Sequence, residues 1–475
     1  MIIAATFWDY NVWACLLVLG VLLLAMAIAN VLRRIIKPLR KTLLPTSVLA
    51  GIIILLFTTI YKIVTKDNFF ELPVFGTSDA LTGQRFLELL TYHCLGIGFV
   101  AMALRSLNKK FGKKETKDIF NSGCLTVGTY LLQGSLGMII SILFVVFGSV
   151  LTFKSAGLLL PFGFGQGTGQ AFNYGTIYEG EGFVGGATFG LTIAALGFLC
   201  ATIGGVIYMN IVRSHGKLKN REKEITEKVL SNYAVPEEID ETGSVDKMTI
   251  QIVIVILTYI VSYLLMALLG NLVPSFKSVI FGFNFLLGTL LAVFVKAIFN
   301  LLKKHNIMHH KYISNYFMNR IGGFAFDIMI VSGIAAIQID LIKDYWVILL
   351  IMALVGTAAT ILYVKVVCRK MFPEYEHEEF VAMYGMLTGT ASTGTILLRE
   401  IDPNFETPAS NNLVFQVLPA IVFGFPMMLI ATYAPLNDKA TYISLGLLII
   451  FFVIMNLILF RSFIFKFKKK EKAQQ

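Results

Sequence analysis

Charged residues are scarce in this chain. They make up only 15% of its 475 residues, whereas soluble domains carry about 25%. Apolar residues make up 56% and the mean hydropathy is +0.75, which together exclude an ordinary soluble enzyme. The five cysteines lie inside apolar runs and form no Cys-x-x-Cys pair, so the sequence indicates neither a disulfide framework nor a zinc site. The first residues lack a basic segment and a small-residue cleavage site, and we expect no cleaved signal peptide.

Long apolar runs fill most of the chain. The hydrocarbon core of a bilayer needs roughly 20 apolar residues for each helix that crosses it, and eleven runs meet this requirement. They lie near residues 12–32, 43–64, 86–107, 122–147, 187–212, 248–269, 278–302, 321–342, 345–368, 411–434 and 440–465. The sequence therefore predicts an all-α polytopic membrane protein.

Lys and Arg residues set the expected orientation, because cytoplasmic connections of membrane proteins are enriched in basic residues. Most of them fall in alternate connections, so we expect the amino terminus outside and the carboxy terminus in the cytoplasm. The basic stretches placed inside are 33–41, 105–117, 213–247, 303–320, 365–370 and 461–472. Since these stretches flank membrane spans, the net charge of +11 favours a lipid bilayer, and no nucleic acid, as the partner.

Two segments, 155–183 and 377–402, are rich in Gly and Thr and too broken by small residues to be ordinary spanning helices. Irregular backbone at membrane depth is tolerated only where it is buried in protein or lines a watery cavity. We therefore expect both segments to be re-entrant and to mark a site. Gly167 and Gly389 lie 222 positions apart, and the spans around them keep similar offsets. Because five spans separate the two copies, the second enters from the opposite face, as in the inverted repeats of secondary transporters.

The only long polar segment divides the chain into two comparable halves. The predicted domains are an N-terminal repeat of five spans (1–213), a cytoplasmic linker (214–247), a C-terminal inverted repeat of five spans (248–435), and an additional span with a basic tail (436–475).

The two Gly/Thr-rich segments also carry the candidate ligands. The first contains GFGQGTGQAFNYGTIYE and the second MYGMLTGTASTGTILLRE. Glycine allows close approach of main chain to a ligand, freed carbonyls can coordinate sodium, and freed N–H groups at the start of a half-helix can hold a carboxylate. The candidate substrate ligands are Gln166, Gly167, Thr168, Gln170, Asn173, Thr390, Ser392, Thr393 and Arg399. The candidate ion ligands are Gly165, Thr388, Gly389 and Asp327.

Each of these features also has a plainer explanation. Either segment alone is as consistent with a loop or a close-packed helix seam, whereas two at matched positions favour a site. Arg399 can bind a substrate carboxylate through two hydrogen bonds, or pair at the interface with Glu400 or lipid headgroups. Asp327, an ionisable residue inside a span, can serve a cation or pair with Arg320. The histidines at 305, 309 and 310 border the membrane, and we expect them to face headgroups and no metal.

The run Gly165-Gln166-Gly167-Thr168-Gly169-Gln170-Ala171-Phe172 resembles the Gly-Gly-His-Gly-Thr-Ala-rich signature of bacterial sodium/glutamate symporters. The stretch 385–394 resembles that family's second Gly/Thr segment. The resemblance spans residues 10–435 and implies an elevator-type carrier in the bacterial inner membrane that works as a homodimer. It implies a small anionic amino acid such as glutamate as substrate, sodium as coupling ion, and neither enzymatic activity nor a cofactor.

Three departures from that family concern substrate identity: Gln166 stands where the family has histidine, Arg399-Glu400 where it has Asn-Met, and the last span is additional. A carrier for another carboxylate or amino acid with proton coupling therefore remains an alternative. A channel and a membrane hydrolase are two others. The hydrolase lacks support, because no nucleophile and base can be assembled around His93, the only histidine inside a span.

Overall fold

The computed structural model describes residues 10–36, 39, 43–76, 82–105, 112–148, 150–214, 247–274, 277–306, 312–403 and 405–461. The regular elements in these ranges are all helices, and eleven of them are long and apolar enough to cross a membrane. They are α1 (Tyr10–Ile35), α3 (Thr46–Thr65), α4 (Gly83–Leu104), α5 (Lys113–Val146), α8 (Gly186–Ser214), α10 (Lys247–Leu272), α12 (Asn284–Lys304), α13 (Asn315–Ala335), α15 (Trp346–Met371), α19 (Val417–Tyr433, extended by a 3-10 turn) and α20 (Asp438–Leu459). The prediction of an all-helical chain with eleven candidate spans is thus confirmed, while most of the predicted linker 214–247 lies outside the described residues.

Several helices depart from their expected limits, and for α5 and α19 the local reason is visible. Helix α5 starts nearer the amino terminus than its apolar run, and the Glu115 carboxylate accepts a hydrogen bond from the Gly112 backbone N–H (3.0 Å) at its first turn. Before α19, a separate short helix, α18, covers Ala409–Phe415. Pro419 explains this break, because a proline ring clashes with the carbonyl four residues earlier, here that of Phe415.

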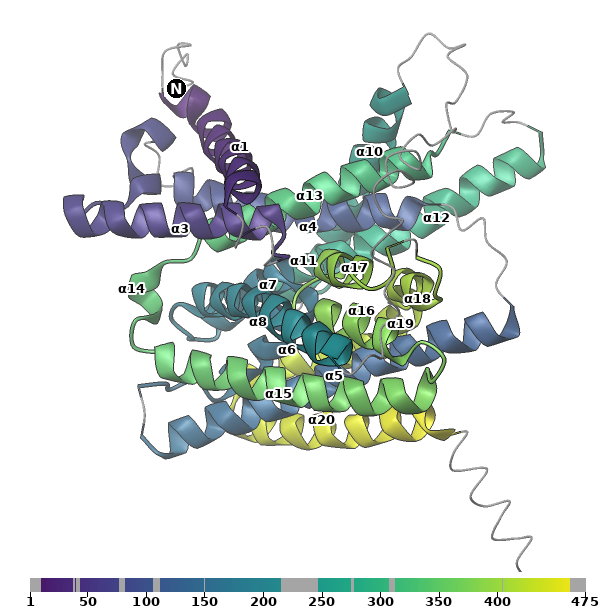
Figure 1. Cartoon of the computed structure of the whole chain (residues 1–475). Coiled ribbons are helices and arrows are strands. Elements are labelled where there is room, and N and C mark those ends of the chain that lie inside the picture. Colours follow the sequence, from purple (N-terminus) through teal and green to yellow (C-terminus); the bar gives the residue numbers. More distant parts are fainter. Residues whose placement is uncertain are drawn as a thin grey trace, which may run out of the picture.

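The spanning helices form two groups (Figure 1). The upper group contains α1, α3, α4, α10, α12 and α13, and the lower group contains α5, α8, α15, α19, α20 and both Gly/Thr-rich segments. Short helices α11 (Lys277–Gly282) and α14 (Ile339–Ile342) lie between longer ones. Each half of the chain supplies three helices to the upper group, in the same chain order, so the two predicted repeats interleave in space.

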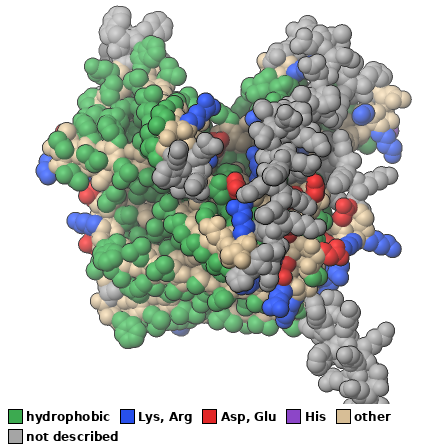
Figure 2. All heavy atoms as spheres, viewed as in Figure 1, with side chains coloured by type: hydrophobic (Ala, Val, Ile, Leu, Met, Phe, Trp, Pro, Cys, Tyr) green, Lys and Arg blue, Asp and Glu red, His purple; other side chains and the backbone are tan. Residues whose placement is uncertain are grey.

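Hydrophobic side chains cover much of the face shown in Figure 2. Among the most exposed residues on the spanning helices are Val64 (75% exposed), Leu354 (68%) and Leu24 (61%). Soluble monomers rarely expose continuous apolar surface on this scale, whereas lipid tails solvate it well. The chain is therefore a multi-pass membrane protein.

Each Gly/Thr-rich segment folds as two helices separated by a break. The first consists of α6 (Leu159–Gln166) and α7 (Thr168–Gly180), and the second of α16 (Glu376–Thr388) and α17 (Ala391–Arg399). At the first break Gly167 has φ +82°, a left-handed conformation that glycine adopts without steric cost. The second break covers Gly389 and Thr390, where neither residue continues the helix.

Helix α8 packs against both segments at very short range. A Cβ atom on Gly190 would lie 2.5 Å from the Ala171 carbonyl oxygen in α7. A Cβ atom on Gly197 would lie 2.5 Å from the Thr388 carbonyl oxygen at the end of α16. Only glycine fits these contacts without displacement, so α8 fixes the position of one break relative to the other.

Candidate functional site

The two breaks meet in space although they come from different halves of the chain. A Cβ atom on Gly167 would lie 3.2 Å from the Cγ2 methyl of Thr390. Helices α6 and α16 end here and α7 and α17 begin here. The last carbonyls and first N–H groups of a helix lack partners within it. The meeting point therefore offers main-chain acceptors and donors together.

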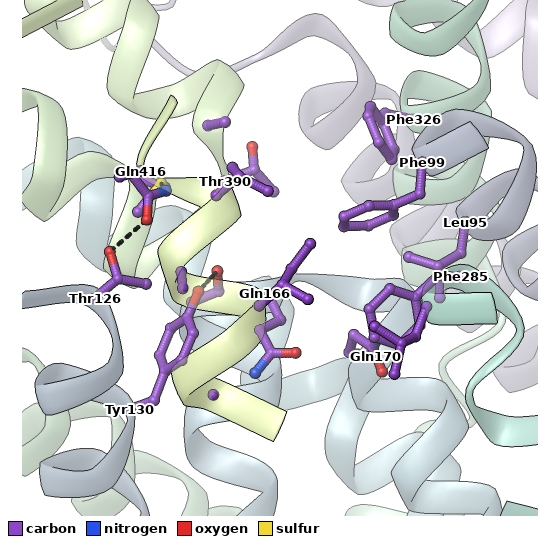
Figure 3. Close-up of a pocket in the computed structure, with 18 of the residues that line it drawn as sticks. Leu95, Phe99, Thr126, Tyr130, Gln166, Gln170, Phe285, Phe326, Thr390 and Gln416 are labelled. Atoms are coloured by element: carbon purple, nitrogen blue, oxygen red, sulfur yellow. Dashed lines mark hydrogen bonds between the residues drawn. The ribbon is translucent and has the colours of Figure 1, made fainter. Parts of the chain in front are cut away.

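A cavity of about 180 Å³ opens beside this point, where the upper and lower helix groups meet. Its two walls differ (Figure 3). One wall is apolar and comes from α4, α12 and α13, with Leu95, Phe99, Phe285 and Phe326 labelled. The other wall comes from the lower group and carries the amides and hydroxyls of Thr126, Tyr130, Gln166, Thr390 and Gln416, while Gln170 of α7 is drawn beside Phe285. Among the described residues that line the cavity, none is Lys, Arg, His, Asp or Glu. The site is polar on one side and carries no formal charge.

Gln170 is the most informative residue of the lining. Its side chain is 1% exposed, and neither its amide nitrogen nor its amide oxygen has a hydrogen-bond partner. Buried polar groups are almost always paired, so an amide that is free at both ends inside a cavity is suited to a ligand. Gln133 provides a contrast. Its Nε2 donates to Thr360 Oγ1 (2.8 Å) and to the Leu387 carbonyl (2.9 Å), and only its Oε1 is unpaired.

The structure brings part of the sequence-predicted set into the cavity. The lining residues from that set are Gly165, Gln166, Gln170, Thr390 and Ser392. Gly167 and Gly389 form the breaks themselves. Residues of the two segments that were expected to cooperate thus share one space.

Other predicted ligands have their polar groups occupied by the protein. Thr168 Oγ1 donates to the Met329 carbonyl (3.2 Å), and Asn173 Nδ2 donates to the Gly282 carbonyl (3.2 Å). The first bond runs from α7 to α13 in the upper helix group, and the second from α7 to the short helix α11. Thr388 Oγ1 bonds within its own helix to a carbonyl one turn earlier (2.6 Å). Thr393 is fully buried and lies 3.5 Å from the Thr390 hydroxyl. In this conformation Thr168 and Asn173 link helices, Thr388 bonds within α16, and none of these four residues lines the cavity.

The two charged candidates lie outside the cavity lining. The Arg399 guanidinium sits 5.5 Å from the centre of the Phe405 ring, and within the described chain it forms no ion pair with Glu400. Asp327 is half-buried on α13, next to the cavity residue Phe326. Neither side chain contacts the cavity in this conformation, so their proposed ligand roles stay predictions.

Three polar residues of the cavity lining, Thr126, Tyr130 and Gln416, were not predicted from the sequence. Tyr130 donates its hydroxyl to the Gly165 carbonyl (3.0 Å), and Thr126 donates to Gln416 Oε1 (2.9 Å). All three belong to helices that read as ordinary spans or their ends. The polar residues that recur once per turn along α5 could have indicated a functional face. They do not indicate which neighbouring helix that face contacts.

A second buried polar network lies in the lower group, at the start of α16. The Glu379 carboxylate is fully buried and accepts hydrogen bonds from Ser122 Oγ (2.6 Å) and Asn412 Nδ2 (2.9 Å). Tyr375, in the turn before α16, donates to Asp118 (2.7 Å). Burial raises the pKa of the Tyr375 phenol, so it remains a donor at neutral pH. These contacts tie α5, α16 and α18 together around a carboxyl group that meets only neutral donors.

Comparison with known protein families, with curated proteins and with solved structures found no match to this chain. Among the described residues, no group of three or more His, Cys, Asp or Glu is placed to hold a metal ion. Two of the three membrane-border histidines, His309 and His310, lie outside the described residues. The interpretation of the site therefore rests on its geometry and on the resemblance of its two motifs.

Proposed function

We propose that the protein is a secondary active transporter that imports glutamate or a similar acidic solute, driven by a sodium gradient. The observation that carries this proposal is the meeting of the two breaks at one cavity, with the unpaired amide of Gln170 inside it. Transporter sites typically form near the bilayer midplane, where broken helices from two repeats converge. No covalent chemistry is needed for this activity.

The neutral lining supports coupling to a cation. A carboxylate moved into a low-dielectric site is costly unless a positive charge accompanies it, and the described lining offers none. A bound sodium ion would supply that charge. Its ligands would be oxygens at the helix ends, where Gln133 Oε1 is buried and unpaired beside the last turn of α16. Coordination by oxygen atoms alone favours a hard cation such as sodium.

The arrangement of helices supports inverted repeats and alternating access. The elements α5, α6–α7 and α8 of the first half correspond in order to α15, α16–α17 and α18–α19 of the second. With five spans between the copies, the two broken segments would be re-entrant from opposite faces and reach one site. The upper helix group would form the fixed part and, by resemblance to the symporters, the homodimer contact. The lower group would carry the substrate in an elevator-type movement across the bacterial inner membrane.

A second candidate is a carrier for a less acidic amino acid or another carboxylate, with proton coupling. The apolar wall favours it, since Phe99, Phe285 and Phe326 would suit a solute with a hydrocarbon side chain.

Radiolabelled uptake into proteoliposomes tests the proposal. Glutamate should accumulate against its gradient only when sodium is higher outside, the rate should saturate, and a sodium ionophore should abolish accumulation. Potassium in place of sodium and protein-free vesicles are the controls. Sodium-independent accumulation would remove the coupling, uptake of a neutral amino acid without glutamate uptake would favour the second candidate, and flux that never saturates would indicate a channel.

A further inference from the structure

A second hollow lies on the lipid-facing side of the lower group, away from the central cavity. It runs between α8 and α15 and has a volume of about 860 Å³. Its rims are aliphatic and open to the surroundings, as shown by Ile203 (59% exposed), Ile207 (53%) and Leu354 (68%). The small residues Gly204 and Ala358 line it as well. An open aliphatic groove of this size is suited to the acyl chains of a lipid.

One end of this α8–α15 groove is basic. Lys365 and Arg369 lie one helical turn apart on α15, so both project on the same side. Both are exposed, and within the described chain neither forms a hydrogen bond or an ion pair. Lys114 differs in this respect, because it is exposed and pairs with Glu374 (2.6 Å).

The remaining ionisable groups at this end do not cancel the two cations. Glu376 supplies one negative charge and forms no ion pair within the described residues. His377 Nδ1 lies 2.9 Å from the hydroxyl of Tyr208, which occupies that ring nitrogen. One basic charge is therefore left without a counter-ion, at the end of α15 where a lipid headgroup would lie.

We propose that the α8–α15 groove is a binding site for one anionic phospholipid. Its acyl chains lie along the isoleucines of α8 and Leu354 of α15, and its phosphate is held by Lys365 and Arg369. Arg369 can contact a phosphate with two parallel hydrogen bonds, and basic pockets between membrane helices suit anionic headgroups. A zwitterionic lipid fills the apolar part equally well but brings its own positive charge, so it gains little from the basic end.

The position of the groove gives the lipid a route to the transport site. Helix α8 forms the groove with Gly204, and less than two turns earlier its Gly197 contacts the end of α16 at the second break. A lipid wedged between α8 and α15 therefore supports the helix that positions both breaks.

Native mass spectrometry of the purified full-length protein tests the site. Delipidated protein is titrated with phosphatidylglycerol and with phosphatidylcholine of the same acyl chains. The wild type should retain phosphatidylglycerol in preference, and the double variant Lys365→Gln/Arg369→Gln should bind it at least about tenfold more weakly, equivalent to about 1.4 kcal/mol. Binding of phosphatidylcholine should not change. The matched control is Lys303→Gln/Lys304→Gln, which removes two exposed charges at the end of α12, outside the groove.

Two further measurements separate the headgroup from the chains. Ala358→Phe should fill the groove and reduce retention of both lipids, while inorganic phosphate should not raise the melting temperature of the wild type. Equal retention of the two lipids by the wild type, or the same loss in the control as in the Lys365/Arg369 variant, would overturn the proposal. Because the readout is lipid binding, it stands whether or not the protein transports glutamate.

Discussion

Replacing Gln170 by leucine should change ligand affinity and protein stability in different directions. Gln170 is 1% exposed and its amide is unpaired at both ends. A buried unpaired polar group costs about 1–3 kcal/mol, so the variant should melt at the wild-type temperature or above it. A ligand that pairs both amide atoms loses two neutral hydrogen bonds of about 0.5–1.5 kcal/mol each. Its affinity should therefore fall about fivefold to 140-fold.

Gln133→Leu is the matched control for stability alone, because Gln133 is equally buried but donates two hydrogen bonds to the protein (2.8 and 2.9 Å), while its free oxygen belongs to the proposed sodium site. Leucine there leaves the Leu387 carbonyl unpaired, so stability should fall by about 1–3 kcal/mol. The assays are thermal unfolding and equilibrium binding of radiolabelled substrate with purified protein. If Gln170→Leu lowers the melting temperature as Gln133→Leu does, and keeps full affinity, then Gln170 is a structural residue and the cavity is not the site.

Three other changes test separate parts of the structure. Gly167→Val should abolish uptake while protein still reaches the membrane, because valine strongly disfavours φ +82°; normal uptake would show that the break only packs helices. Glu379→Gln should melt near the wild type, since an amide can bond with Ser122 and Asn412, whereas Glu379→Leu removes the acceptor of Ser122 Oγ and one of the two acceptors of Asn412 Nδ2, and should lose about 2 kcal/mol; equal melting temperatures would contradict the network's role. Ser392→Cys, in a cysteine-free background, should react with a small thiol reagent and be protected by sodium plus substrate; labelling that ignores substrate argues against occupancy of the cavity.

The spanning helices could be predicted from the sequence because a bilayer imposes length and hydrophobicity on each of them. The limits of α5 and α19 could not, since they depend on a capping carboxylate and on Pro419, which act within one turn. The two breaks were also readable, because runs of glycine and threonine are poor helix formers at any depth. The proximity of Gly167 to Thr390 could not be predicted from composition, because it depends on how the two segments pack.

Individual ligands were harder to predict for a related reason. Gln170 and Thr168 lie two positions apart on α7, yet one faces the cavity and the other bonds to α13. Residues two apart on a helix point in different directions, and only tertiary packing decides which direction leads to the site. The same reasoning applies to Tyr130 on α5 and to Gln416 between α18 and α19, where the composition is not unusual.

The apolar wall of the central cavity affects how easily the lower helix group could slide along the upper one. The side chains that α4 and α13 present to the cavity include Leu95, Phe99 and Phe326, which are apolar. They form no directional hydrogen bond that would have to break when the lower group moves. The neutral hydrogen bond of Thr168 does cross to α13, and that of Asn173 reaches α11, but each is worth only about 1 kcal/mol net. Dispersion contacts re-form continuously along such a surface. Because one wall is apolar and the lower group carries most of the polar groups, a solute bound to the lower group would keep its hydrogen bonds while that group moves.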